Sequence, residues 1–283
     1  HACSLATYNA DATGGVSEVF IPSGTYLSSR ALYVYGNTRV VNDGHMKFTG
    51  GNQIGGFVWI QAANNVEMVG GIWDSNVQYN DNTIAVTNGG GDSTTVMGPP
   101  SENIWIHHMT VQNATHGGYH ISPDNDPIPI SNPANVGGGG GKGITVQFGA
   151  KSVIISDVII QDCSIGFSVE GKEHPDGRSE DIIFNDINVK DSQYMGILCS
   201  SNLGGQDLYG VTTSVSMNNI LLTDCGNGQT DEAIPQDVAD LFGAITNNGM
   251  VGIRAENVTV RSTGGNTTVL RGGMRFCDWD IHA

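Results

Sequence analysis

A repeated phrase in the middle of the chain limits the possible folds more than any other feature. Copies begin at Glu102, Lys151 and Glu180, and each has a short alternating run, an Asn or Asp turn, a second short run and a polar residue. A third run follows each copy, at residues 119–122, 167–170 and 197–200. Three short strands per repeat with polar corners are typical of a chain that coils and stacks on itself.

Stacked coils place equivalent residues above one another. Parallel strands about 4.8 Å apart satisfy each other's backbone groups, and inward positions alternate with outward ones. We expect two inner stacks, one of Ile121, Val169 and Cys199 and one of Ile106, Ile155 and Phe184. Asn65, Asn103 and Asn219 fall at corners, where asparagine tolerates left-handed backbone and can hydrogen-bond to its counterpart in the next coil.

The composition agrees with one all-β domain. The 283 residues include 40 glycines and 9 prolines, which indicates many turns and few long helices. We predict a single domain over residues 1–283, in which residues 123–142 form a loop insertion rich in Gly, Pro and Asp. The five cysteines are an odd number, which argues against a disulfide framework. Cys163 and Cys225 lie at matching corners two coils apart, so we expect them to be small core residues.

The net charge of −16 disfavours several kinds of partner. It repels nucleic acids and anionic membranes, so we expect neither of them as a partner. No apolar run approaches the ~20 residues that span a bilayer. The chain starts without Met and carries sequons at Asn113, Asn257 and Asn266, so we expect a secreted glycoprotein, and we expect it to be a monomer.

A stretch near the N-terminus carries a resemblance to a known family. From Val19 the chain reads Val-Phe-Ile-Pro-Ser-Gly-Thr-Tyr-Leu, which resembles the opening coil of the pectate-lyase-like superfamily. The resemblance extends to about Asp278 and implies a right-handed single-stranded parallel β-helix of roughly 8–10 coils. Residues 1–18 would then be a remnant of the N-terminal cap.

The second half of the repeat region is similar in layout to the polygalacturonases of the same superfamily. That family carries paired aspartates and a His-Gly before two of these runs, whereas this chain has Ile165-Gly166 and Met195-Gly196 there. The polygalacturonase catalytic residues are therefore absent. The run from Glu170 to Arg178 resembles the acidic metal-binding and basic catalytic run of alginate and chondroitin lyases.

Titratable and polar residues gather on the outward positions of the third runs and on the loops where those runs exit. The candidate catalytic residues are Lys172, Arg178, His120 and Glu170. The candidate substrate-binding residues are Ser122, Ser168, His174, Asn247 and Arg271. The candidate metal ligands are Asp124 and Glu173, whose hard oxygens suit Ca²⁺.

These residue types fit two reactions on a polysaccharide. In β-elimination, Lys172 or His120 removes the proton next to a uronate carboxylate, and Arg178 or a cation stabilises the resulting charge. In hydrolysis, Glu170 and Asp124 act as the carboxylate pair on either side of the glycosidic bond. We expect a carbohydrate-active enzyme that cleaves a uronate-containing polysaccharide by elimination. The alternatives are a glycoside hydrolase and a non-catalytic glycan-binding or scaffold β-helix.

We expect two other groups of residues to have structural roles. His107 and His108 are adjacent, so their side chains should point to opposite sides, and we expect corner packing in place of a shared metal. Trp59, Trp73 and Trp105 lie in strand patterns and are expected to pack. Any of these tryptophans that faced outward would instead offer a platform on which a sugar ring can stack.

Overall fold

The computed structural model describes most of the repeat region. The described residues are 15–50, 53–77, 80–88, 98–114, 119–121, 127–129, 141–171, 177–193, 195–200, 211–226, 243–248, 250–261, 263 and 280–282. The regular structure in these ranges consists of strands, and they contain no α-helix. None of the described segments is a helix long and apolar enough to cross a membrane.

The strands form two large parallel sheets and one small antiparallel pair. Sheet A contains β1 (Ser17–Ile21), β2 (Thr25–Ser28), β4 (Thr38–Asn42), β5 (His45–Phe48), β7 (Asn64–Val69), β8 (Ile72–Asp74), β10 (Glu102–Gln112), β14 (Lys151–Gln161), β16 (Glu180–Lys190), β18 (Val211–Thr223), β20 (Met250–Arg261) and β21 (Asp280–His282). Sheet B contains β3 (Leu32–Val34), β6 (Gln53–Gln61), β9 (Asn80–Thr87), β13 (Lys142–Gln147), β15 (Ile165–Glu170), β17 (Met195–Ser200) and β19 (Gly243–Asn248). The antiparallel pair is β11 (Tyr119–Ile121) with β12 (Pro127–Pro129).

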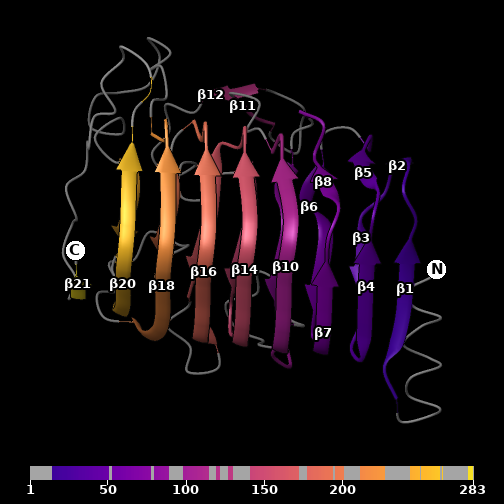
Figure 1. Ribbon diagram of the computed structural model, residues 1–283, viewed down its shortest axis with the longest axis horizontal. Helices are drawn as coiled ribbons and strands as arrows, with labels where there is room; N and C mark the ends of the chain where they lie inside the picture. The colour runs from indigo at the N-terminus through magenta and orange to yellow at the C-terminus, as the bar shows by residue number, and fades with distance from the viewer. Residues whose placement is uncertain are drawn as a thin grey trace.

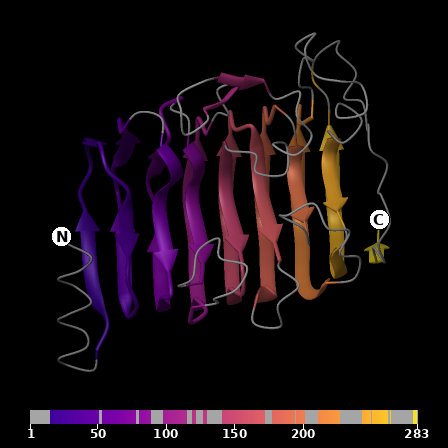
Figure 2. The same cartoon turned by 180° about the vertical axis from the view of Figure 1, so that it is seen from behind.

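The chain alternates between the two sheets and so winds into a right-handed parallel β-helix, as predicted. Successive coils begin at β1, β4, β7, β10, β14, β16, β18 and β20, and these strands lie side by side in chain order (Figures 1 and 2). These eight coils of the described residues agree with the expected number. The long strands β10, β14 and β16 each continue through a corner as one strand. In the preceding coil two strands, β7 and β8, occupy the positions that pair with β10.

Two columns of left-handed residues make the corners of sheet A. One column contains Asn65, Asn103, Ser152 and Asp181, and the other contains His108, Asp157, Asp186, Asn219 and Asn257. The Asn103 amide donates to Asn65 Oδ1 over 3.4 Å, and the Asn219 amide donates to Asp186 Oδ1 over 3.0 Å. The predicted left-handed, hydrogen-bonded corners are therefore confirmed, because short polar side chains tolerate this backbone and bond to the next coil.

The interior follows the predicted stacks with one correction. Ile106, Ile155 and Phe184 are in register and fully buried. In the other stack Val169 pairs with Cys199, but the third member is Val146 and not Ile121. Ile121 belongs to β11, which pairs with β12, and the coil reaches sheet B only at β13, after the glycine-rich segment.

Three cysteines lie in this interior. Cys163, Cys199 and Cys225 are buried, which confirms the expectation that Cys163 and Cys225 are core residues. Burial raises the pKa of Cys163 to about 12 and that of Cys225 to about 11. The Cys163 and Cys225 thiols therefore stay protonated and unreactive in the folded protein.

The predicted cap and insertion are described only in part. Residues 1–14 of the cap remnant lie outside the described residues. Within the predicted insertion at 123–142, the structure describes β12, Gly141 and Lys142, and Lys142 is already the first residue of β13. The remainder of the insertion stays a prediction.

Candidate functional site

The outer face of sheet B carries the described part of the predicted rim. Ser168 and Glu170 lie two residues apart on β15, and the Ser168 hydroxyl is 3.0 Å from Glu170 Oε1. The structure therefore brings these two residues together. Both are buried, at 0% and 1% exposure, because every residue of β15 is shielded on both faces of the sheet.

A buried ion pair occupies the Glu170 carboxylate. Lys142 Nζ binds Glu170 Oε1, and the side chains of both residues are buried. β13 and β15 are neighbours in sheet B, so the pair joins two successive coils. Charges removed from water in this way need a partner, since the desolvation of each ion costs several kcal/mol. The Glu170 carboxylate is thus committed to Lys142 and Ser168.

A chain of short polar contacts continues from this ion pair along the helix axis. Ser168 Oγ lies 3.1 Å from Thr145 Oγ1, and Thr145 Oγ1 lies 2.5 Å from Asn82 Oδ1. The Ser168 hydroxyl has one proton and two possible acceptors, Thr145 and Glu170. The Thr145 hydroxyl donates to Asn82 Oδ1, so the Ser168 proton is shared between Thr145 and Glu170.

The other described residues of the predicted site have different positions. Arg178 is half-buried beyond the end of β15, and its Nε is buried without a hydrogen-bond partner among the described residues. The neighbouring Ser179 hydroxyl donates to the Glu170 carbonyl over 3.2 Å, so Arg178 stays close to the exit of β15. Asn247 is in register with Cys199 on the inner side of sheet B, and its side chain bonds to the Met250 backbone. Its amide therefore does not lie on the outer face.

Most of the predicted rim lies outside the described residues. This is true of Lys172, Glu173, His174, Ser122, Asp124 and Arg271. The backbone of His120 is described in β11, but its side chain is not. The clustering of these residues at a catalytic or calcium site stays a prediction.

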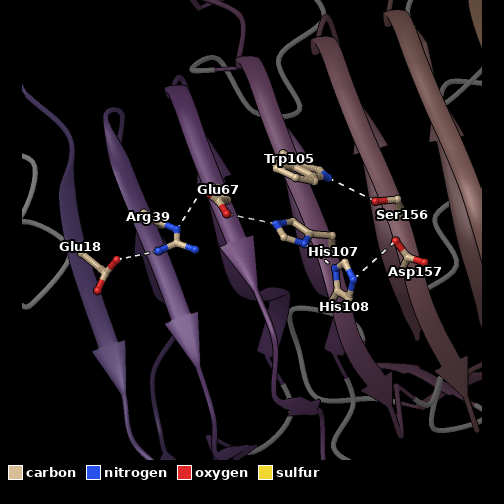
Figure 3. A network of polar contacts seen from close by, with 8 residues as sticks. All are labelled: Glu18, Arg39, Glu67, Trp105, His107, His108, Ser156 and Asp157. Carbon is tan, nitrogen blue, oxygen red and sulfur yellow. Dashed lines mark hydrogen bonds and ion pairs between the residues drawn. The ribbon is translucent and has the colours of Figure 1, made fainter.

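Sheet A presents a second group of side chains that the sequence did not identify as a site. We call it the Trp105 stripe, and it consists of Glu18, Arg39, Glu67, Trp105, His107, His108, Ser156 and Asp157 (Figure 3). The members come from β1, β4, β7, β10 and β14, so the stripe crosses the strands and runs along the axis of the helix.

Trp105 is the exposed aromatic residue of the stripe. Ile104 and Ile106 on either side point into the core, so alternation sends Trp105 outward, where it is 43% exposed. Its indole nitrogen donates to Ser156 Oγ over 3.2 Å, and its ring stacks on the His107 imidazole with centroids 3.8 Å apart. The expectation that Trp105 packs inside is wrong, whereas Trp73 is buried as expected and Trp59 is half-buried.

Charged groups alternate on the N-terminal side of Trp105. Arg39 Nη1 is 2.8 Å from Glu18 Oε2, Arg39 Nε is 3.0 Å from Glu67 Oε2, and Glu67 Oε1 is 3.2 Å from His107 Nε2. The hydrogen bonds of Arg39 to Glu18 and Glu67 raise the pKa of its guanidinium group, and the bond to Glu18 has the larger effect. Burial lowers the pKa of His107, against the opposing effect of its hydrogen bond to Glu67. The neutral imidazole is therefore favoured at this position.

The two histidines touch each other, which corrects the expectation that they point apart. His107 Nδ1 and His108 Nδ1 are 2.7 Å apart, and the rings meet edge to face. His108 has a left-handed φ of 53°, and this corner interrupts the alternation of a regular strand. Among the described residues, no group of three or more His, Cys, Asp or Glu side chains is arranged to hold a metal ion.

The chain is therefore a right-handed parallel β-helix with the Trp105 stripe on the outer face of sheet A. No family model matches the chain. No curated protein matches it either.

Several solved structures are similar to the chain. One is the N-terminal fragment of gene product 12 from bacteriophage Phi29, with a TM-score of 0.49, 15% identity, and coverage of 88% of this chain and 49% of that one. Another is an endo-xylogalacturonan hydrolase from Aspergillus tubingensis, with a TM-score of 0.44, 12% identity, and coverage of 97% and 86%. A third is the A-module of a mannuronan C-5 epimerase from Azotobacter vinelandii, with a TM-score of 0.43, 12% identity, and coverage of 92% and 70%. The chain spans about half the length of the phage fragment. At these identities the likenesses concern the fold and not the reaction.

Proposed function

We propose that this protein acts on a polysaccharide that lies along the axis of the β-helix. The observation that carries the proposal is the exposed indole of Trp105, held in place by Ser156 and His107. An aromatic ring with one apolar face and fixed polar neighbours is suited to stack on a sugar ring while its surroundings bond to hydroxyl groups.

The neighbours of Trp105 support an extended ligand more than a small one. Glu67 precedes it and Ile154 and Ile183 follow it in one row across the coils. Both isoleucines are exposed, at 42% and 41%. The row therefore offers charged and hydrogen-bonding groups on one side of the indole and an apolar strip on the other. A sugar chain has hydroxyl edges and apolar ring faces that match both parts.

For the reaction, we propose β-elimination of a uronate-containing polysaccharide at the exit of the sheet B strands. Lys172 or His120 would be the base, and Arg178 would stabilise the carboxylate. Any calcium ion would be held by Asp124 and Glu173. Glu170 is assigned a supporting role in this proposal, because its carboxylate is bound to buried Lys142. The same contact disfavours hydrolysis by Glu170 and Asp124, since a general acid must reach the glycosidic oxygen.

Glycan binding is tested first, because it does not depend on the reaction. Retention of the protein in gels that contain neutral or uronate-rich polysaccharides gives an apparent affinity for each. Trp105→Ala should weaken binding to the preferred glycan about fivefold or more, the effect expected for a central aromatic contact. Tyr35→Ala is the matched control, since Tyr35 is also exposed, at 40%, but lies outside the stripe. Equal binding by wild type and Trp105→Ala would refute the proposed binding surface.

The reaction is tested separately with the same glycans. Elimination produces an unsaturated uronate, so the ultraviolet absorbance of the mixture should rise together with the number of new reducing ends. Lys172→Ala should remove this activity and leave binding at the Trp105 stripe unchanged. New reducing ends without the absorbance would establish hydrolysis instead. Binding without any product would identify a non-catalytic glycan-binding β-helix.

A further inference from the structure

The His107–His108 pair has a feature that glycan binding does not require. The Nδ1 atoms of the two rings face each other at 2.7 Å, while each Nε2 faces a carboxylate. His107 Nε2 is 3.2 Å from Glu67 Oε1, and His108 Nε2 is 3.9 Å from Asp157 Oδ2. Figure 3 shows this order, from carboxylate to imidazole to imidazole to carboxylate, across β7, β10 and β14.

The protons of the pair can be assigned from these contacts. An ionised carboxylate only accepts hydrogen bonds, so the nitrogen that faces it carries the proton. Glu67 thus fixes the proton of neutral His107 on Nε2 and leaves a lone pair on His107 Nδ1, whereas His108 Nε2 is 3.9 Å from Asp157 Oδ2, beyond hydrogen-bond distance. The hydrogen bond between the two Nδ1 atoms therefore has His108 Nδ1–H as its donor and His107 Nδ1 as its acceptor. A cation that displaces this single proton would find both Nδ1 lone pairs at the spacing of two neighbouring ligands.

We propose that His107 Nδ1 and His108 Nδ1 form a binding site for a divalent transition metal ion, with Cu²⁺ as the preferred ion. Imidazole nitrogen suits this class of metal, and Cu²⁺ binds such ligands more tightly than the other first-row divalent ions. Two nitrogens about 2.0 Å from a metal and adjacent in a square plane are about 2.8 Å apart. The observed separation of 2.7 Å needs almost no adjustment, and the exposed His108 ring can supply it.

The surroundings of the pair fit a bound cation. Histidine ligands usually donate their second ring N–H to a carboxylate, which fixes the tautomer and makes the ligating nitrogen more basic. Glu67 is placed to do this for His107, and the Asp157 carboxylate lies 3.9 Å from His108 Nε2 as a nearby negative charge. Arg39 is the nearby positive group, and its charge is balanced by Glu18 and Glu67. The protein supplies two ligands, so the remaining positions of the metal are open to water or to sugar hydroxyls.

Trp105 provides a spectroscopic readout that does not depend on enzymatic activity. Its ring stacks on His107, so a Cu²⁺ ion bound at Nδ1 lies close enough to quench the indole fluorescence. The protein is titrated with a copper salt alone, in a background in which His1→Ala removes that histidine as a competing ligand. The protein with His107 and His108 intact should show saturable quenching of its tryptophan fluorescence. Its copper electron paramagnetic resonance spectrum should show coupling to imidazole nitrogens. Trp105→Phe should abolish the quenching and retain the spectrum.

The test variant is His108→Asn, which keeps the corner intact. Asn219 and Asn257 occupy the same left-handed column, so asparagine is compatible with the backbone at position 108. The affinity of the variant for copper should fall by at least ~10–100-fold, because the loss of a group that only hydrogen-bonds to a metal ligand already has an effect of this size. Asp186→Asn is the matched control from the same column and should bind copper like the parent protein.

Three results would overturn the proposal. The first is that His108→Asn keeps both the affinity and the quenching of the parent. The second is a copper spectrum that is identical with and without His108, which would place the ion at another histidine. The third is no saturable binding by the parent, in which case the two rings share only a proton. Circular dichroism of each variant confirms that the β-helix has folded before the titrations are compared.

Discussion

Removal of the Lys142 ammonium group should destabilise the protein far more than removal of an exposed lysine. Lys142→Met leaves the Glu170 carboxylate buried at 1% exposure without its cation. Breaking a buried ion pair in this way costs about 3–5 kcal/mol of the free energy of unfolding. The chain offers a matched control in Lys151, whose partly exposed side chain is 3.6 Å from that of Glu180, and Lys151→Met should cost at most about 1 kcal/mol.

The assay is urea unfolding followed by tryptophan fluorescence, with thermal unfolding as a second measurement. The Lys142→Met variant should unfold at a clearly lower urea concentration, and its midpoint temperature should fall on the order of 10 °C. The double variant Lys142→Met/Glu170→Met should recover most of the loss, because an apolar pair of similar volume removes the unpaired charge. Equal midpoints for the Lys142 and Lys151 variants, or no recovery in the double variant, would refute the reasoning.

Three further predictions concern packing, thiols and pH. Gly166→Ala should lower the free energy of unfolding by about 1–3 kcal/mol, because a Cβ at this position would lie 2.4 Å from Val189 Cγ1. A urea midpoint equal to that of the wild type would contradict this packing. Cys163 and Cys225 should resist a thiol reagent until urea unfolds the chain, since burial raises their pKa to about 12 and 11; rapid labelling in buffer would oppose this. Burial lowers the pKa of His107 in the folded protein. The unfolded chain therefore binds a proton at a higher pH than the folded protein does, because the ordinary pKa of histidine is about 6.5. The free energy of unfolding should consequently fall as the pH drops below about 6.5. His107→Gln should flatten that part of the pH profile, and an unchanged slope would argue against the assignment.

Much of the fold was predictable because it follows from a short-range pattern. The stack of Ile106, Ile155 and Phe184 can be read directly from alternation within each copy of the repeat. Ile121 was misplaced because the coil that contains β10 reaches sheet B only at β13, after a long insertion. Alternation alone cannot tell which of two apolar runs on either side of an insertion joins the sheet.

The candidate site was less predictable, for two physical reasons. Trp105 lies between two core isoleucines, so its outward direction was available from the same alternation. Its hydrogen bond to Ser156 and its position beside Glu67, however, depend on the register between coils, which sets neighbours that are far apart in the sequence. Likewise, the outward direction of Glu170 was predictable, but its pairing with Lys142, 28 residues earlier, required the three-dimensional structure.

Strand β16, which lies inside sheet A, illustrates how the protein should respond to local damage. It pairs with β14 on one side and β18 on the other, and each coil contacts little beyond its two neighbours. Stability in such an array is approximately a sum of terms for single coils and for their interfaces, as in a one-dimensional lattice. Melting should therefore start at the ends, whereas a defect in β16 would divide the molecule into two unequal parts that unfold independently. Amide hydrogen exchange along the axis should follow the same gradient, with the slowest amides in the central coils.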